Sequence, residues 1–294
     1  MGSGSFTTTS FKAYSTSRGR TVDAKGMVTS DSLQDFYTQT KIHKDLKPYK
    51  VVRECCDSEE HPNTIPVIIG LDVTGSMGRA CIKTAQSLNT IITSLYDKFD
   101  DIEFMIMGIG DLAYDSAPIQ ASQFESDVRI AEHLDKVYME HGGGGNGFES
   151  YTAAWYFGLH HTKLDCWKRG KKGIIITMGD EPLNPYLPKY PLEKITGDNL
   201  EADVETKDLY ELTKEKFDIY HIAIDDFDDC YQIYKSRVDA SFGDLLKEDY
   251  KISTLDELPS TIIKCIENSV NGYSIDKSVK TTETVNNNSN YISW

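Results

Sequence analysis

The hydrophobic positions of this chain form two alternating patterns. The first is a continuous apolar run, which is typical of a strand buried on both faces. Such runs occupy Ile65–Leu71, Ile102–Gly110, Gly173–Gly179 and Phe217–Ile224, with a weaker one at Tyr250–Thr254. The second is an apolar residue at every third or fourth position, which predicts a helix with one buried face. This second pattern covers residues 82–99, 128–138, 149–161 and 255–269.

The alternation of these patterns predicts the fold class. Strands that alternate with helices indicate an α/β fold with a doubly wound, mostly parallel sheet and helices on both faces. A shorter run at Ala117–Phe124 contains Pro118 near its start. Because proline cannot donate to a sheet ladder, we expect this run to form an edge strand.

Acidic residues follow the predicted strands. Asp72, Asp111, Asp180 and Asp225 each stand at or just after the end of an apolar run. Parallel strands end at one edge of the sheet, where ligands bind in such folds. We therefore expect an acidic edge at which a divalent cation would relieve the repulsion between carboxylates.

The first of these ends carries hydroxyl groups as well. Asp72-Val73-Thr74-Gly75-Ser76 places one carboxylate and two hydroxyls on a tight turn. Mg²⁺ and Mn²⁺ prefer oxygen ligands, and Mg²⁺ keeps several waters, so this donor set suits such an ion. The alternative is that Asp72 and Ser76 only cap the helix that follows.

This Asp-x-Thr-x-Ser sequence after an apolar strand resembles the first motif of the von Willebrand factor A domain. The resemblance covers residues 64–273 and implies that the edge strand is antiparallel. It implies a metal-ion-dependent adhesion site in which Asp72, Thr74 and Ser76 bind the ion. Asp180 resembles the last motif of the family, although Met-Gly-Asp-Glu-Pro replaces the usual Thr-Asp-Gly.

The middle motif of the family departs further in this chain. Where the family places a Thr, the sequence reads His141-Gly-Gly-Gly-Gly-Asn-Gly-Phe-Glu-Ser150, which resembles the Gly-rich loops of bacterial and phage-type members. Asn146 or Glu149 would supply the oxygen ligand, with Ser150 and Thr152 as weaker candidates. A phosphate-binding loop is the alternative, but the Gly-Lys-Ser/Thr ending of a nucleotide loop is missing.

Segments outside this domain are polar. Residues 1–63 are expected to form an N-terminal arm that is flexible and solvated up to Arg20, with one short helix within 30–41. Residues 274–294 are expected to form a polar C-terminal tail. After Asp180, a stretch rich in Pro and Tyr, 182–191, is expected as a loop before the next helix begins near Asn199 or Leu200. Its tyrosines are candidate partner contacts or simple loop packing.

Composition limits the setting and the partners. The net charge is −15, and residues 1–50 carry eight Lys or Arg against four Asp, so the remainder is strongly acidic and nucleic-acid binding is not expected. No apolar run reaches about 18 residues, so no membrane span is expected. Six cysteines, with Cys55 and Cys56 adjacent and no N-terminal signal sequence, favour reduced thiols in a cytoplasmic location.

The leading hypothesis is a non-enzymatic, divalent-cation-dependent protein-binding module. The resemblance implies that Mg²⁺ or Mn²⁺ is held by Asp72, Thr74, Ser76, Asp180 and either Asn146 or Glu149, and that a partner protein contributes an acidic residue. One alternative is an assembly protein, virion-associated and phage-encoded, with a vestigial site. Another is a metal-dependent phosphohydrolase with Glu181 or Asp111 as general base.

Overall fold

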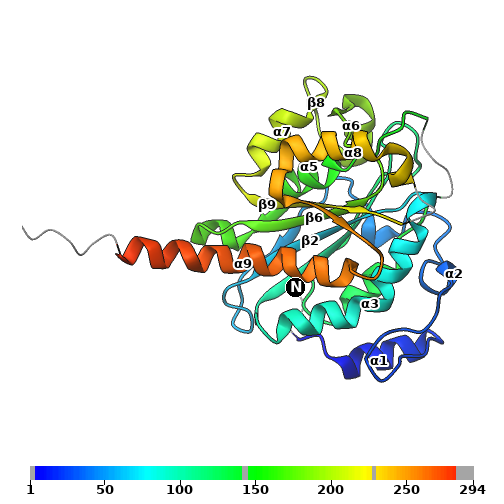
Figure 1. Ribbon diagram of the computed structural model, residues 1–294, viewed down its shortest axis with the longest axis vertical. Helices are drawn as coiled ribbons and strands as arrows, with labels where there is room; N and C mark the ends of the chain where they lie inside the picture. Colours follow the sequence, from blue (N-terminus) through cyan, green and yellow to red (C-terminus); the bar gives the residue numbers. More distant parts are fainter. Residues whose placement is uncertain (1–3, 141–144, 227–229, 283–294) are drawn as a thin grey trace, which may run out of the picture.

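A six-stranded sheet forms the centre of the protein (Figure 1). The computed structural model describes residues 4–140, 145–226 and 230–282. The strands of the sheet are β2 (Ile65–Asp72), β3 (Ile102–Ile109), β4 (Ile119–Ala121), β6 (Gly173–Gly179), β9 (Phe217–Ile224) and β10 (Tyr250–Ser253). Their order is β10-β9-β6-β2-β3-β4, and only the β3–β4 pair among them is antiparallel.

Helices cover both faces of this sheet. On one face lie α1 (Thr8–Ser17), α2 (Leu33–Phe36), α3 (Gly78–Tyr96), α4 (Arg129–Asp135) and α9 (Leu258–Thr282); on the other lie α5 (Thr152–His160), α7 (Thr206–Thr213) and α8 (Cys230–Leu246). Strand β2 shows the two layers, because Val67, Ile69 and Leu71 pack into the first hydrophobic cluster and Ile68 into the second. The predicted fold class is therefore confirmed.

The remaining elements are short. They are strands β1 (Arg53–Cys55), β5 (Thr162–Leu164), β7 (Tyr186–Leu187) and β8 (Val204–Glu205), helix α6 (Lys189–Thr196), and the 3-10 turns Lys44–Leu46, Gly75–Met77, Asp165–Arg169 and Lys247–Asp249. Strands β1 and β5 pair in parallel, which ties the segment before the sheet to the end of α5. No helix in the described ranges has both the length and the apolar character that a membrane crossing requires.

The Pro-rich and Tyr-rich stretch is more ordered than the sequence predicts. It contains β7, which pairs with β8, and the start of α6. Pro191 lies in the first turn of α6, where its missing N–H removes no helix bond. Gly197 then ends the helix at a φ of +82°. The next helix, α7, begins at Thr206, so the start predicted near Asn199 or Leu200 is wrong.

The N-terminal segment is not a solvated arm. Thr7 caps α1, and its hydroxyl accepts a hydrogen bond from the backbone N–H of Ser10. Phe6 and Phe11 are buried against the first hydrophobic cluster. Arg20 forms a buried ion pair with Asp135 at 2.7 Å. The expectation of a flexible segment up to Arg20 is therefore wrong, whereas the short helix expected within 30–41 is present as α2.

The last helix extends past its predicted end. Helix α9 continues beyond Ser269 to Thr282, and Figure 1 shows it projecting past the edge of the sheet. The pattern of apolar positions fades after Val270, which is why the sequence indicated an earlier end. Residues 283–294 of the predicted tail lie outside the described residues, as do 141–144 of the Gly-rich loop.

Candidate functional site

The candidate site lies where the chain direction across the sheet reverses. From β2 the chain continues to β3 on one side, and it later returns to β6 on the other side of β2. Open α/β sheets bind ligands at this type of switch point, outside the carboxyl ends of the strands. Asp72 is the last residue of β2, and Asp180 directly follows β6. Both carboxylates are fully buried.

Three hydrogen bonds hold the carboxylate of Asp72. The backbone N–H and the hydroxyl of Thr74 donate to Oδ1 at 2.9 and 2.5 Å, and the hydroxyl of Tyr151 donates to Oδ2 at 2.7 Å. Burial, and then the charge of Asp180, raise the pKa of Asp72 to about 7, although these bonds oppose the rise. A positive charge at this position would therefore be strongly stabilised.

Ser76 connects the turn to the second strand end. It lies in the 3-10 turn before α3 and donates a hydrogen bond to Asp180 Oδ1 at 3.1 Å. Helix α3 has Met77 at its N-cap position and no side-chain cap. The hydroxyl groups of Thr74 and Ser76 therefore point to carboxylates and do not cap the helix.

Glu149 is brought to the same place from the Gly-rich loop. Its side chain is buried, and Oε2 has no hydrogen-bond partner in the described part of the chain. Burial raises its pKa to about 11, with further contributions from Asp72, Glu181, Asp115 and Asp111. A buried carboxylate oxygen without a donor, close to other acids, is the arrangement that a cation would complete.

The other loop candidates occupy different positions. Asn146 hydrogen bonds to Asp111, at the end of the neighbouring strand, and its Oδ1 is buried without a partner in the described structure. Ser150 Oγ accepts a bond from the backbone of Leu112 at 3.0 Å. Thr152 Oγ1 accepts one from Asn184 at 2.6 Å. Ser150 and Thr152 thus stabilise loops, whereas Asn146 faces the acidic edge.

These side chains belong to a larger group that we name the acidic rim. Its members are Asp72, Asp111, Asp115, Glu149, Asp180 and Glu181. Burial raises the pKa of Glu181 to about 7 and that of Asp115 to about 6, in each case with help from neighbouring acids. Asp225 is not among the acids that raise these pKa values, and its carboxylate accepts a hydrogen bond from Gln232 of α8.

The donors at the switch point fit a hard divalent cation better than a soft one. Within the described ranges, no three His, Cys, Asp or Glu side chains are arranged so that they could hold a metal ion by themselves. An ion here would rely on Asp72, Asp180, the hydroxyls of Thr74 and Ser76, and water. Mg²⁺, which keeps several waters and needs few carboxylates, matches this set.

Tyr151 and Gly179 are parts of the site that the sequence did not indicate. A Cβ on Gly179 would lie 2.0 Å from the hydroxyl oxygen of Tyr151, so only glycine leaves room for this ring beside Asp72. The ring also lies edge-on to His221 at 4.9 Å between centroids. A glycine inside a strand often marks such a close approach, and Gly179 before Asp180 was the available signal.

Comparison with known proteins gives weak likenesses of structure. No protein-family model matches the chain, and no curated protein sequence matches it. The pilus adhesin SpaC from Lactobacillus rhamnosus GG aligns at 12% identity and a TM-score of 0.48, over 72% of this chain and 31% of that one. This chain thus spans less than a third of the SpaC length.

Two further structures align in the same range. The vWF domain of the pilus tip protein Mfa5 from Porphyromonas gingivalis has 10% identity and a TM-score of 0.45, over 78% of this chain and 99% of that one. Proximal thread matrix protein 1 from the mussel byssus has 13% identity and a TM-score of 0.42, over 70% and 45%.

Proposed function

We propose that this protein is a divalent-cation-dependent protein-binding module. In this proposal Mg²⁺ or Mn²⁺ is held by Asp72, Thr74, Ser76 and Asp180, with Glu149 of the Gly-rich loop completing the shell through a water molecule. The observation that supports it most is the pair of fully buried carboxylates at the switch point, each hydrogen bonded to a hydroxyl from one turn. A bound ion would supply a positive charge to which an acidic side chain of a partner protein could bind.

Hydrogen bonds within the chain orient the Asp72 carboxylate before an ion binds. Thr74 and Tyr151 fix both oxygens of Asp72, so the carboxylate keeps one orientation. Tyr151 is itself packed against His221 and Phe242. Fixed donors of this kind raise metal affinity because little reordering is needed when the ion binds.

The surroundings of the rim favour a protein as the partner. Tyr114 is 61% exposed and lies on the loop between Asp111 and Asp115. Tyrosine is enriched at protein interfaces, because it buries a large area at low entropic cost. We therefore place Tyr114 in the contact surface beside the ion.

The test is a titration of metal into chelator-treated protein. We expect saturable binding of Mg²⁺ and Mn²⁺ by calorimetry, with a raised melting temperature because the ion binds only the folded state. Asp72→Ala should abolish both effects. Asp225→Ala is the matched control, because it removes a carboxylate at another strand end, and it should bind the ion normally.

Two other outcomes would favour the alternative functions. Absence of binding by the parent protein would contradict it and would leave the assembly role with a vestigial site. Magnesium-dependent turnover of p-nitrophenyl phosphate that Asp72→Ala abolishes would instead favour the phosphohydrolase, with Glu181 as the base to examine next.

A further inference from the structure

A hollow of about 610 Å³ lies between α5, α7 and the segment that joins α6 to β8. Part of its lining is apolar, and Leu212 of α7 is 59% exposed there although its side chain is large and aliphatic. The rest is acidic, and among the described residues no Lys or Arg lines it. The carboxylates belong to Asp198, Glu201, Asp203, Glu205 and Asp208. We name this feature the acidic hollow.

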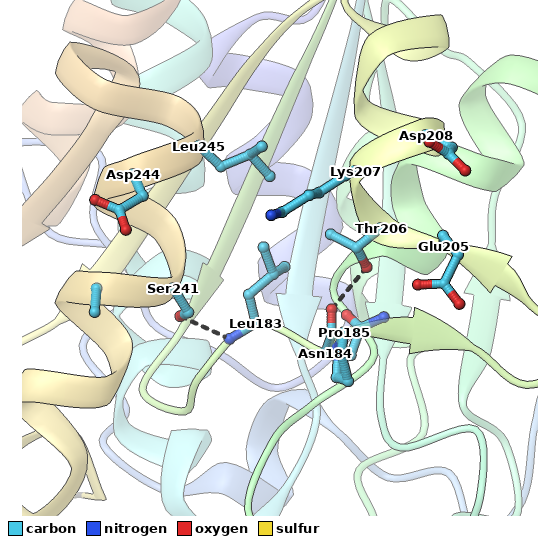
Figure 2. A pocket seen from close by; sticks show the side chains of 11 residues that line it. Leu183, Asn184, Pro185, Glu205, Thr206, Lys207, Asp208, Ser241, Asp244 and Leu245 are labelled. Carbon is cyan, nitrogen blue, oxygen red and sulfur yellow. Dashed lines mark hydrogen bonds between the residues drawn. The ribbon is translucent and has the colours of Figure 1, made fainter.

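Three of these carboxylates are unpaired. The side chains of Glu201, Glu205 and Asp208 form no hydrogen bond or ion pair with any described residue. Lys189 donates to the backbone oxygen of Glu201 and not to its carboxylate. Lys207 does not line this hollow, and Figure 2 shows its ammonium group directed toward α8, away from the carboxylates of Glu205 and Asp208. The acidic hollow therefore matches a ligand with positive charges and apolar side chains.

An exposed surface of opposite charge is formed by residues 47–52, which we name the basic segment. Its exposed side chains alternate between basic and apolar, in the order Lys47, Tyr49, Lys50 and Val52. Tyr49 and Val52 are 54% and 58% exposed. Among the described residues no carboxylate pairs with Lys47 or Lys50, although the ammonium group of Lys50 lies 5.4 Å from the ring centre of Tyr49. The basic segment therefore has the composition that the acidic hollow matches.

The two surfaces are neighbours on the same molecule. Lys50, whose backbone is left-handed with a φ of +54°, donates its N–H to Thr196 O at 2.7 Å. The side chains of Tyr49 and Lys50 then lie against Gly197, where a Cβ would be 3.0 and 2.7 Å from them. Gly197 directly precedes Asp198 of the acidic hollow. The basic segment therefore borders the hollow of its own chain without lining it.

A histidine holds the two surfaces in a fixed relation. The ring of His161 has Nδ1 3.0 Å from Val51 O and Nε2 2.7 Å from Asp198 Oδ2. The hydroxyl of Tyr156 donates to the same oxygen of Asp198 at 2.6 Å. One buried side chain thus connects the basic segment to the acidic hollow. Surfaces that are ordered before association lose less entropy when they bind.

Adjacent surfaces of opposite charge make this region complementary to itself. A two-fold axis brings the same patch of two subunits together, so a contact between two positions is formed twice. When the basic segment of one copy faces the acidic hollow of another, the reverse contact forms as well. Tyr49, Val52 and Leu212 then come together, and apolar side chains of this kind form the centre of protein interfaces. Charge and apolar area therefore both favour a second copy as the occupant.

We propose that two copies of this chain form a two-fold dimer in which the basic segment of each lies in the acidic hollow of the other. Lys47 and Lys50 pair with the carboxylates that are unpaired in the single chain. The interface is distinct from the proposed ion site, because α5 begins beside the acidic rim and ends at the hollow, about 13 Å further along its axis. The dimer therefore leaves both rims open. This inference goes beyond the proposed function and does not depend on it.

The mass in solution is the first measurement. Light scattering on the full chain, over a wide range of concentration, should give twice the 33.1 kDa of the chain at the upper end. Added NaCl should shift the dimer toward the monomer, because salt screens exposed ion pairs. Chelator should leave the dimer unchanged. A parent protein that stays monomeric throughout overturns the proposal, and a dimer that chelator dissociates would involve the ion site and would overturn this interface.

Charge reversal locates the interface. The double variant Lys47→Glu/Lys50→Glu reverses the basic segment, and Glu205→Lys/Asp208→Lys reverses two charges of the acidic hollow. Each should raise the dissociation constant of the dimer about tenfold or more, because like charges then face each other at both copies of the contact. Unchanged dimer affinity in both variants would place the interface elsewhere and overturn the proposal.

A control variant separates this effect from net charge. Lys25→Glu/Lys264→Glu changes the net charge by the same amount as Lys47→Glu/Lys50→Glu. Lys25 and Lys264 are exposed and lie outside the acidic hollow and the basic segment. We expect the control to dimerise like the parent protein. Equal weakening in the control would assign the effect to general repulsion and contradict the proposed contact.

A mixture of the two reversed variants tests the pairing itself. In an equimolar mixture the reversed segment of one variant faces the reversed hollow of the other, so opposite charges meet again at both contacts. We expect the mixture to form a heterodimer more tightly than either variant forms a homodimer, which an unfolded variant could not do. A mixture that associates no better than its components overturns the two-fold pairing.

A different occupant of the hollow would also be detected. The probe is a labelled Lys-rich peptide with one Tyr, measured by fluorescence polarisation. If the parent protein is monomeric and binds this peptide, and Glu205→Lys/Asp208→Lys does not, the acidic hollow binds another basic protein and the dimer proposal is wrong.

Discussion

The hydroxyl of Tyr151 donates to Asp72 Oδ2 at 2.7 Å, across 79 residues of sequence. Tyr151 precedes α5 and Asp72 ends β2, so the bond joins the layer of helices to the end of the central strand. Because it favours the ionised carboxylate, this bond keeps the pKa of Asp72 lower than burial alone would set it.

Removal of this bond should weaken metal binding. Tyr151→Phe leaves the ring in place but frees Oδ2 of Asp72, and we expect about a tenfold loss of Mg²⁺ affinity by calorimetry. The control is Tyr156→Phe, which removes a similar bond to Asp198, formed at 2.6 Å and away from the rim. Equal affinities in the two variants would show that Tyr151 does not support the site.

A side chain at Gly179 should displace Tyr151. In Gly179→Ala the added Cβ would overlap the hydroxyl and two ring carbons of Tyr151, and we expect a loss of about 1–3 kcal/mol in the free energy of unfolding. Gly243→Ala in α8 is the comparison, since nothing lies within 4 Å of its Cβ. It should be neutral or stabilising by up to about 1 kcal/mol, because alanine favours helix. Urea denaturation measures both.

The acidic rim should make the stability of the metal-free protein depend on pH. The pKa of Asp72 is raised from 3.8 to about 7, so the folded state holds a proton that the unfolded state has released. The free energy of unfolding that Asp72 contributes is therefore fully present below about pH 4, and it is lost as the pH rises to about 7. Asp72→Asn should flatten this slope in thermal melts.

Metal binding should follow the opposite trend. Since Mg²⁺ requires the ionised carboxylate, its affinity should rise as pH increases through about 7. A Mg²⁺ affinity that is constant between pH 5.5 and pH 8 would show that no rim carboxylate loses a proton when the ion binds.

Two variants can show whether Glu149 or Asn146 is the residue of the Gly-rich loop that contributes to the ion site. At neutral pH the raised pKa of Glu149 keeps it protonated without metal, so Glu149→Gln should leave the metal-free stability nearly unchanged. If Glu149 contributes to the ion site, the Mg²⁺ affinity of Glu149→Gln should be about tenfold or more below that of the parent protein. Asn146→Ala removes a side chain that pairs with Asp111, and it should have the smaller effect. The reverse order of effects would assign the ligand to Asn146.

The N-terminal segment should contribute to stability. The side chains of Arg20 and Asp135 are 5% and 7% exposed, so Arg20→Ala removes a buried ion pair and leaves Asp135 with the hydrogen bond from Tyr14 and the longer contact with Arg18. We expect a loss of about 1–3 kcal/mol in the free energy of unfolding. Lys83→Ala, which breaks an exposed pair with Asp256, should cause no measurable change. A small effect of Arg20→Ala would restore the idea of a loosely attached arm.

The ends of β2, β3, β6 and β9 were predictable, because each is marked by a change from apolar to acidic residues in a short window. Asp72 and Asp180 could be placed together for this reason, since parallel strands end at one edge. Tyr151 could not, because an aromatic residue at the start of a buried helix has the same local pattern whether or not its hydroxyl reaches a carboxylate. Phe6 and Phe11 were missed because single apolar residues among Ser and Thr give no period.

Helix α5 has seven of its nine residues buried, so the start of this helix cannot shift without disturbing the core. Tyr151 directly precedes this helix and Glu149 lies three residues before its start, so both share that constraint. The surface proposed for the partner, at Tyr114, is exposed. Evolution could therefore change the exposed contact residues, and with them the partner, at little cost in stability. Substitutions at Glu149 or Tyr151 would also disturb the buried start of α5 and would therefore lower stability.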